Sequence, residues 1–208
     1  MPVTLYAATT NLGKLRDFSV AAAEASITVQ PLPNLTTIPV PPENEPTFAG
    51  NARAKAQYYS RFTRDFVLAD DSGLEVDALG GEPGVRSARF ADDAGFDPHS
   101  PGAEVSTDAR NNLYLLSRMR GIALRAARYR CALALARDGE VLVTAEGFVD
   151  GEILTAGRGT GGFGYDPLFQ LPHLRLTMAE IPLEQKHTIS HRGRAFRALI
   201  PGLSKLLD

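Results

Sequence analysis

Short apolar runs alternate with amphipathic helical segments along the chain. Val3 to Ala8 is apolar and partly β-branched, which predicts a buried strand. A loop of turn-forming residues follows, and a helical pattern begins at Lys14, with Leu15 and Phe18 on its apolar face. A strand, a short polar loop and a helix in this order direct loop N–H groups and a helix N-terminus at one point, which favours an anion.

The next predicted elements flank a proline-rich stretch. Gln30 to Pro46 holds six prolines and predicts a loop or sheet-edge region. Thr47 is placed to cap a helix that runs to about Arg61. Phe66 to Ala69 predicts a second buried strand, which should end at Asp70-Asp71.

The second half of the chain predicts a helix and then a hairpin. Thr107 to Met119 has helical spacing, with Leu113, Leu116 and Met119 as its apolar stripe. Arg128 to Phe148 contains two apolar runs joined by Asp138-Gly139, the strongest short hairpin signal. Crossover helices combined with a hairpin indicate an α/β fold with a mixed sheet and flanking helices.

The C-terminal segment predicts one more helix. From Ser190 the pattern turns Phe196, Leu199 and Leu203 inward. Pro201 should kink or interrupt this helix, because proline cannot donate the backbone hydrogen bond.

Composition limits the class of protein. The 208 residues, 44% hydrophobic and 22% charged, suit a single domain, 1–208. The net charge of −2 argues against a general nucleic-acid binder, although it allows a local basic pocket. No apolar run approaches the roughly 20 residues of a membrane span, so we expect a soluble, cytoplasmic protein. The single Cys131 excludes an internal disulfide and predicts a buried structural thiol.

Two acidic segments are candidates for metal chemistry. Asp70 and Asp71 follow a buried strand, and neighbouring strand residues face opposite sides, so one should face a pocket and the other inward. Two adjacent acids are equally typical of a turn. Glu43 and Glu45 lie in the proline-rich loop and are solvated unless the fold brings one close to Asp71. Magnesium usually takes one or two carboxylates plus substrate phosphates, which such a pair would suit.

A glycine-rich stretch at 157–162 is the next candidate. It matches G-x-G-x-x-G, but it does not join a first strand to a helix and lacks the Gly-Lys-Ser/Thr of a phosphate-binding P-loop. The aromatic residues Phe163 and Tyr165 and the acid Asp166 follow it. They could clamp a nucleobase by stacking and read its edge by hydrogen bonds.

A basic cluster precedes the last helix: Lys186, His187, Ser190, His191 and Arg192. Ser190 alone is a plausible helix cap. Cations at a helix N-terminus are unfavourable, however, and a bound anion would resolve that conflict. Together with Lys14, the cluster could hold a triphosphate.

Several sequence motifs resemble those of one protein family, and they occur in the same order along nearly the whole chain. They are Thr9-Thr10-Asn11-Leu12-Gly13-Lys14; Glu43 with Thr47-Phe48 and Asn51-Ala52; Ala69 to Leu74; Gly81 to Gly84 with Ser87-Ala88-Arg89; Gly162 to Pro167; and Met178-Ala179-Glu180, Glu184, Lys186 and Ser190 to Gly193. The chain resembles the inosine triphosphate pyrophosphatases, or XTP/dITP diphosphatases. The resemblance implies Mg²⁺-dependent hydrolysis of ITP, dITP and XTP to the monophosphate and pyrophosphate. It also implies two lobes around a central cleft and a homodimer.

The resemblance also implies roles for individual residues. Asp71 would be the general base and a Mg²⁺ contact, with Glu43 as a second metal-linked acid, although Glu45 is one register step away. The residues implied to bind substrate are Thr9, Thr10, Asn11, Lys14, Ser72, Phe163, Gly164, Tyr165, Asp166, Lys186, His191 and Arg192.

The chain departs from the family pattern at Asp17, where glutamate is common, and in the long proline-rich stretch Asp92 to Ser106. Two alternatives stay open: a nucleotide pyrophosphatase of different base preference, and a non-catalytic nucleotide or nucleic-acid binder.

Overall fold

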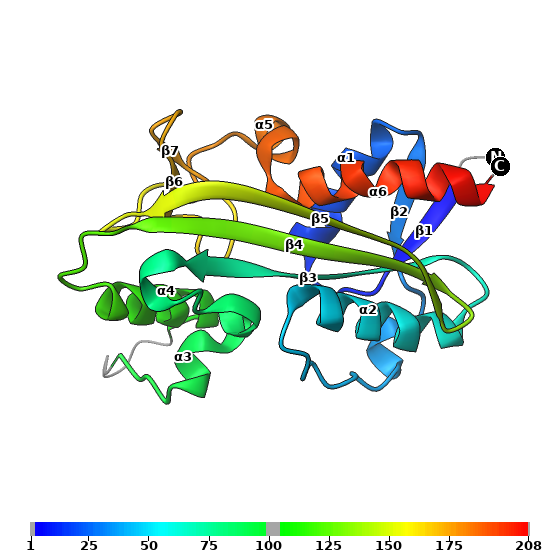
Figure 1. The fold of residues 1–208 in the computed structure, drawn as a ribbon, viewed down its shortest axis with the longest axis horizontal. Coiled ribbons are helices and arrows are strands. Elements are labelled where there is room, and N and C mark those ends of the chain that lie inside the picture. The colour runs from blue at the N-terminus through cyan, green and yellow to red at the C-terminus, as the bar shows by residue number, and fades with distance from the viewer. Residues whose placement is uncertain (1–2, 99–104, 208) are drawn as a thin grey trace. The chain divides into compact units, whose positions relative to one another are not determined.

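The computed structural model describes residues 3–98 and 105–207, which contain a seven-stranded sheet in the order β2-β1-β3-β4-β5-β6-β7 (Figure 1). The strands are β1 (Val3–Ala7), β2 (Ile27–Pro31), β3 (Val67–Val76), β4 (Ala126–Arg137), β5 (Glu140–Ile153), β6 (Phe169–Leu171) and β7 (Leu176–Thr177). The α-helices are α1 (Leu12–Ala23), α2 (Phe48–Tyr59), α3 (Phe90–Asp93), α4 (Thr107–Arg118), α5 (Leu183–Ile189) and α6 (His191–Leu207). Short 3-10 helices are η1 (Leu35–Thr37), η2 (Ser60–Phe62), η3 (Asp77–Leu79) and η4 (Gly84–Arg89). Because β1 pairs in parallel with β2 and β3 while β5, β6 and β7 pair antiparallel, the predicted mixed sheet is confirmed.

The chain divides into two compact units. The first unit comprises Met1–Ser72, Arg130–Val149 and His187–Asp208, and the second comprises Gly73–Tyr129 and Asp150–Lys186. Strands β3, β4 and β5 each pass from one unit into the other along the backbone.

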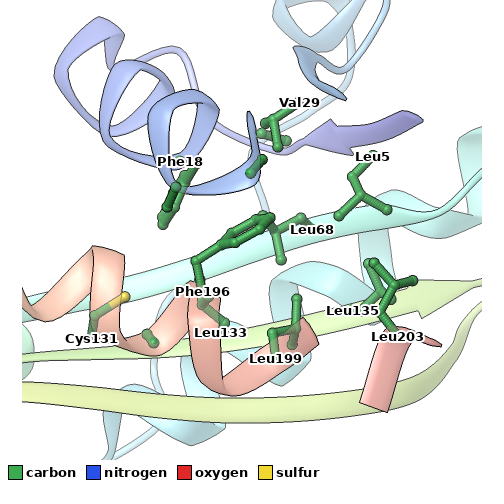
Figure 2. Packing of buried hydrophobic residues seen from close by; sticks show 14 residues of the cluster. Leu5, Phe18, Val29, Leu68, Cys131, Leu133, Leu135, Phe196, Leu199 and Leu203 are labelled. Atoms are coloured by element: carbon green, nitrogen blue, oxygen red, sulfur yellow. The ribbon is translucent and has the colours of Figure 1, made fainter. Parts of the chain in front are cut away.

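The core of the first unit lies between its strands and the pair α1 and α6 (Figures 1 and 2). Phe18 of α1 and Phe196 of α6 meet with ring centroids 6.3 Å apart, over Leu5 and Leu68 of the strands. The thiol of Cys131 is buried in the same cluster, and burial raises its pKa, so the predicted structural thiol is confirmed.

Helix α2 covers the other face of these strands, which receives alternate strand residues (Figure 1). Val67 packs beneath Leu32 and Tyr59, whereas the next residue, Leu68, belongs to the α1–α6 core. Thr47 caps α2 by accepting a hydrogen bond from the Gly50 N–H at 3.0 Å, as predicted.

The predicted end of the third strand is wrong. Strand β3 continues through Asp70 and Asp71 to Val76, and Leu74 and Val76 are fully buried. In the sheet β3 lies between β1 and β4, and it pairs with β1 in parallel at Val67 and Leu68, before the two acids. A pair of acids can stay inside such a strand because each carboxylate has a cationic partner.

The predicted apolar stripe of the 107–119 helix is wrong in part. Helix α4 buries Leu115 and Met119, whereas Leu113 is 44% exposed. The polar Asn111 is buried with them, since its side chain accepts from the Ala91 N–H at 2.9 Å and donates to the Ala88 carbonyl at 3.1 Å.

The predicted hairpin and C-terminal helix are confirmed, and the hairpin strands extend beyond the predicted 128–148 at both ends. Asp138 and Gly139 have φ of 52° and 81°, as a two-residue turn between paired strands requires. Ser190 caps α6 by accepting from the Gly193 N–H at 3.1 Å. The helix is not interrupted at Pro201 but runs on to Leu207.

No helix within 3–98 and 105–207 is long and apolar enough to cross a membrane. Part of the proline-rich stretch Asp92 to Ser106, namely 99–104, lies outside the described residues.

Candidate functional site

The β1–α1 loop of the first unit presents the N-terminus of a helix. Thr9 Oγ1 accepts from the Asn11 N–H at 3.2 Å, and Asn11 Oδ1 accepts from the Lys14 N–H at 3.0 Å, which caps α1. Thr10, Asn11 and Leu12 are exposed. The exposed start of α1, which has no acidic residue in its first turn, therefore offers N–H groups and a positive dipole end to an anion.

Asp70 is the inward member of the acidic pair. Its Oδ2 lies 2.9 Å from Lys14 Nζ and accepts from the Ser72 hydroxyl at 3.0 Å. Burial alone would raise the pKa of Asp70, but the cations Lys14, Lys55 and Arg192 together lower it to about 2. Asp70 is therefore ionised near neutral pH, and its charge holds Lys14 in place.

Asp71 has a different set of partners. Its Oδ2 accepts from the Asn51 side-chain amide at 2.9 Å, and its Oδ1 lies 3.7 Å from Lys55 Nζ. Burial raises the pKa of Asp71, and this effect outweighs the opposing effects of Lys55 and Asn51. A carboxylate of raised pKa is a stronger base than an ordinary aspartate, which suits it to accept a proton.

The side chain of Lys55 connects Asp71 to the proline-rich loop. Lys55 Nζ donates to Glu43 Oε1 at 3.1 Å. Glu45 is exposed, and its backbone N–H donates to Asn51 Oδ1 at 3.0 Å. Of the two candidate acids, the structure thus brings Glu43 and not Glu45 to the ammonium group that Asp71 also faces.

Two carboxylates that face one cationic group are a donor set that fits Mg²⁺, which takes one or two carboxylates together with substrate phosphates. Within 3–98 and 105–207, no group of three or more His, Cys, Asp or Glu side chains is arranged to hold a metal ion.

Arg192 and Asp17 form a buried ion pair at the start of α6. Arg192 Nη1 lies 3.2 Å from Asp17 Oδ2, and Nη2 donates to Ser72 Oγ at 3.1 Å. Ser72 in turn donates to Asp70, so one chain of contacts runs from α1 through α6 to β3. His191 is also buried at the start of this helix.

The second unit holds the aromatic and acidic residues that follow the glycine-rich stretch. Asp166 Oδ2 accepts from the Phe163 N–H at 2.9 Å and from Lys186 Nζ at 2.5 Å, and both side chains of this ion pair are buried. The Gly164 N–H donates to Asp108 Oδ2 at 2.7 Å. The Tyr165 hydroxyl points inward and donates to the Ser87 carbonyl at 2.8 Å, and burial raises its pKa.

The predicted site residues are divided between the two units. Thr9, Thr10, Asn11, Lys14, Glu43, Asp71, Ser72, His191 and Arg192 belong to the first unit, and Phe163, Gly164, Tyr165, Asp166 and Lys186 to the second. No functional role was predicted for Asn51, Lys55 or Asp17. Asn51 and Lys55 are four residues apart on one face of α2, a signal that points to a shared polar partner.

The ionisation of Asp70 gives a stability prediction with a defined pH window. Since its folded pKa is about 2, below the ordinary 3.8, its stabilisation is complete above pH 4 and is lost as the pH falls from about 4 to about 2. The shift corresponds to about 2 kcal/mol. Urea unfolding should show Asp70→Asn less stable than wild type by about this amount at pH 6, and by much less at pH 2.5.

The control for this prediction is Asp138→Asn, at an exposed turn where Asn also tolerates positive φ. Its stability difference from wild type should be small at both pH values. An Asp70→Asn deficit that does not change with pH would contradict the assignment of a lowered pKa of about 2 to Asp70.

Known proteins match this chain over nearly its whole length. The sequence profile of the Ham1 family matches residues 5–202. The dITP/XTP pyrophosphatase of Acidobacterium capsulatum is 58% identical over 204 residues, which cover 98% of this chain and 99% of the relative. The protein of the same name from Geobacillus kaustophilus is 45% identical, over 92% of this chain and 90% of its own.

A solved structure agrees as well. The HAM1 protein from Coxiella burnetii superposes with a TM-score of 0.80 at 32% identity, and the match covers 98% of this chain and 99% of the other. The resemblance found in the sequence motifs is thus confirmed by matches over nearly the whole length. The chain belongs to the Ham1 family.

Proposed function

We propose that the protein hydrolyses non-canonical purine nucleoside triphosphates, namely ITP, dITP and XTP, to the monophosphate and pyrophosphate with the help of Mg²⁺. The observation that carries the proposal is the cluster in which Asn51 and Lys55 hold Asp71 and Glu43. The names of the similar dITP/XTP pyrophosphatases support the choice of substrate.

Glu43 and Asp71 would hold the metal ion. Both carboxylates already face one positive charge, the ammonium group of Lys55. When bound, Mg²⁺ would neutralise phosphate charge and leave coordination positions for substrate oxygens. Lys55 would then balance the remaining charge of the two acids.

Asp71 would act as the general base. It would take a proton from the water that attacks the anhydride between the α- and β-phosphates; a phosphorus–oxygen bond forms to that water as the anhydride bond breaks. The Asn51 amide fixes the orientation of the carboxylate. The exposed start of α1 and the Lys14 ammonium would bind the phosphate groups and stabilise the charge on the departing pyrophosphate.

Residues of the second unit would recognise the base. Phe163 and Tyr165 would contribute the aromatic surroundings, and the buried Lys186–Asp166 pair would supply the polar contact. A site that donates a hydrogen bond to the 6-keto oxygen of hypoxanthine or xanthine leaves unpaired groups against the 6-amino group of adenine. Deaminated purines would therefore be preferred to adenine.

The test is pyrophosphate release from dITP, XTP, dGTP and dATP, with Mg²⁺ and with EDTA in its place. We expect kcat/KM for dITP and XTP to exceed that for the other two by about 10²-fold or more, and we expect EDTA to abolish turnover. Equal efficiencies on all four substrates would contradict the base preference. Nucleotide binding without any pyrophosphate release would favour the non-catalytic binder.

The homodimer implied by the resemblance and the cytoplasmic location expected from the composition stay predictions. Light scattering of the purified chain at micromolar concentration would test the first of these.

A further inference from the structure

Tyr129 lies directly behind the base-recognising residues, although it belongs to none of the sequence motifs. It sits on β4, within the second unit, and is buried. Its ring packs on Phe169 of β6 with centroids 4.3 Å apart, and its hydroxyl donates to Asp166 Oδ1 at 3.2 Å. Tyr129 thus has a ring packed against Phe169 and a hydroxyl that donates to the acid of the Lys186–Asp166 pair.

The Asp166 carboxylate receives donors on both of its oxygens. Oδ2 accepts from Lys186 and from the Phe163 N–H, while Oδ1 accepts from Tyr129. A carboxylate held on one oxygen alone can rotate about its terminal torsion, which is broad in energy. The Tyr129 hydroxyl fixes that rotation from the opposite side.

The glycine-rich loop rests directly on this pair. A Cβ built on Gly162, which has φ of 76°, would overlap with Asp166 Oδ2 and lie 2.6 Å from Lys186 Nζ. The loop therefore has no room to adjust if the carboxylate turns. A rotation of Asp166 would move Lys186 and the backbone at Phe163 together.

We propose that Tyr129 is a positioning residue that sets base selectivity: through Asp166 it fixes the Lys186 ammonium and the Phe163 backbone at the nucleobase end of the site. The inference rests on the proposed function. It assigns Tyr129 no contact with the phosphates and no part in the attack of water.

Tyr129→Phe is the test, since it keeps the ring on Phe169 and removes only the hydroxyl. We expect KM for dITP to rise about tenfold, the size of one lost hydrogen bond to a charged group. The dITP-to-dATP ratio of kcat/KM should fall by a similar factor, because adenine lacks the 6-keto oxygen, while kcat for dITP stays within about twofold. Inhibition by inorganic triphosphate, which has no base, should be unchanged.

Two further variants should be measured beside Tyr129→Phe, one as a control and one to test whether Tyr129 acts through Asp166. Tyr114→Phe removes a hydroxyl that accepts from Arg118 in the same unit and should match wild type in all four measurements. Asp166→Asn should shift KM and selectivity in the same direction, and adding Tyr129→Phe to it should cause little further change, because both act through one contact.

Outcomes that would overturn the role of Tyr129 differ from the outcome that would overturn the proposed function. Wild-type KM and selectivity in Tyr129→Phe would overturn the inference. So would a lower kcat, or weaker inhibition by inorganic triphosphate, since either marks a general structural effect. If the wild-type protein releases no pyrophosphate from any of the four nucleotides, the proposed function fails, and the inference fails with it; no result with Tyr129→Phe alone gives that outcome.

Discussion

Asp71→Asn should reduce kcat for dITP by about 10²- to 10⁴-fold, the range that a positioned general base contributes. Asparagine has the same shape and can still accept the hydrogen bond from the Asn51 amide, but it cannot take a proton from water. The fold should persist, because the neighbouring ion pair between Asp70 and Lys14 is untouched. Initial rates of pyrophosphate release and a thermal melt of the same sample would measure both quantities.

The same chemical change at Asp77, an exposed acid six residues later, is the matched control and should leave kcat unchanged. Asp71 is also proposed to contact the metal ion, so the Asp71→Asn rates should be repeated at high Mg²⁺. Recovery of wild-type kcat at high Mg²⁺ would show that Asp71 is a ligand only. A rate that stays low at saturating Mg²⁺ supports its role as the base.

The elements that the sequence predicted well carry strong local signals. Asp138-Gly139 supplies positive φ at two successive positions, and Asn11, Thr47 and Ser190 cap helices with their own side chains. Strand β2 and the short strands β6 and β7 gave no such signal. Their two to five residues are held by backbone pairing, of β2 with β1, of β6 with β5 and of β7 with β6, and β2 ends at Pro31.

The sequence predicted only those residues of the candidate site that lie in recognisable motifs. Separate partners for Asp70 and Asp71 followed from strand alternation, and the structure confirms them. The partners themselves could not be predicted, because they come from other elements. Lys55 reads as a surface lysine of an amphipathic helix until the fold brings Glu43 to it, and Asp17 contacts a residue 175 positions away.

Gly147 illustrates a role that pattern analysis overlooks, because within β5 it is one small residue of a hairpin strand. A Cβ at this position would overlap with the His191 carbonyl oxygen and the Ala195 backbone nitrogen of α6, and lie 2.9 Å from Ala195 Cα. Glycine inside a strand often marks such a close backbone approach. Because helix backbone cannot rotate away as a side chain can, Gly147→Ala must displace α6 from the sheet.

We therefore expect Gly147→Ala to destabilise the protein by about 3 kcal/mol, the upper part of the range for overpacking. The melting temperature should fall by roughly 10 °C for a chain of this size. Displacement of α6 would also separate Arg192 from Asp17 and Ser72, so kcat/KM for dITP should fall even at temperatures where the variant is folded. Urea unfolding and steady-state rates at 20 °C measure the two effects.

Gly157→Ala is the matched control, since the nearest atom to its added Cβ would be the Pro167 Cβ at 3.4 Å, an ordinary contact. Its stability should stay within about 0.5 kcal/mol of wild type. If Gly147→Ala unfolds at the same urea concentration as Gly157→Ala, α6 does not rest on β5 at this point. If it is destabilised but keeps wild-type kcat/KM, α6 packs there and Arg192 is not needed in its present position. Only a loss of both would show that the close approach at Gly147 places Arg192 for function.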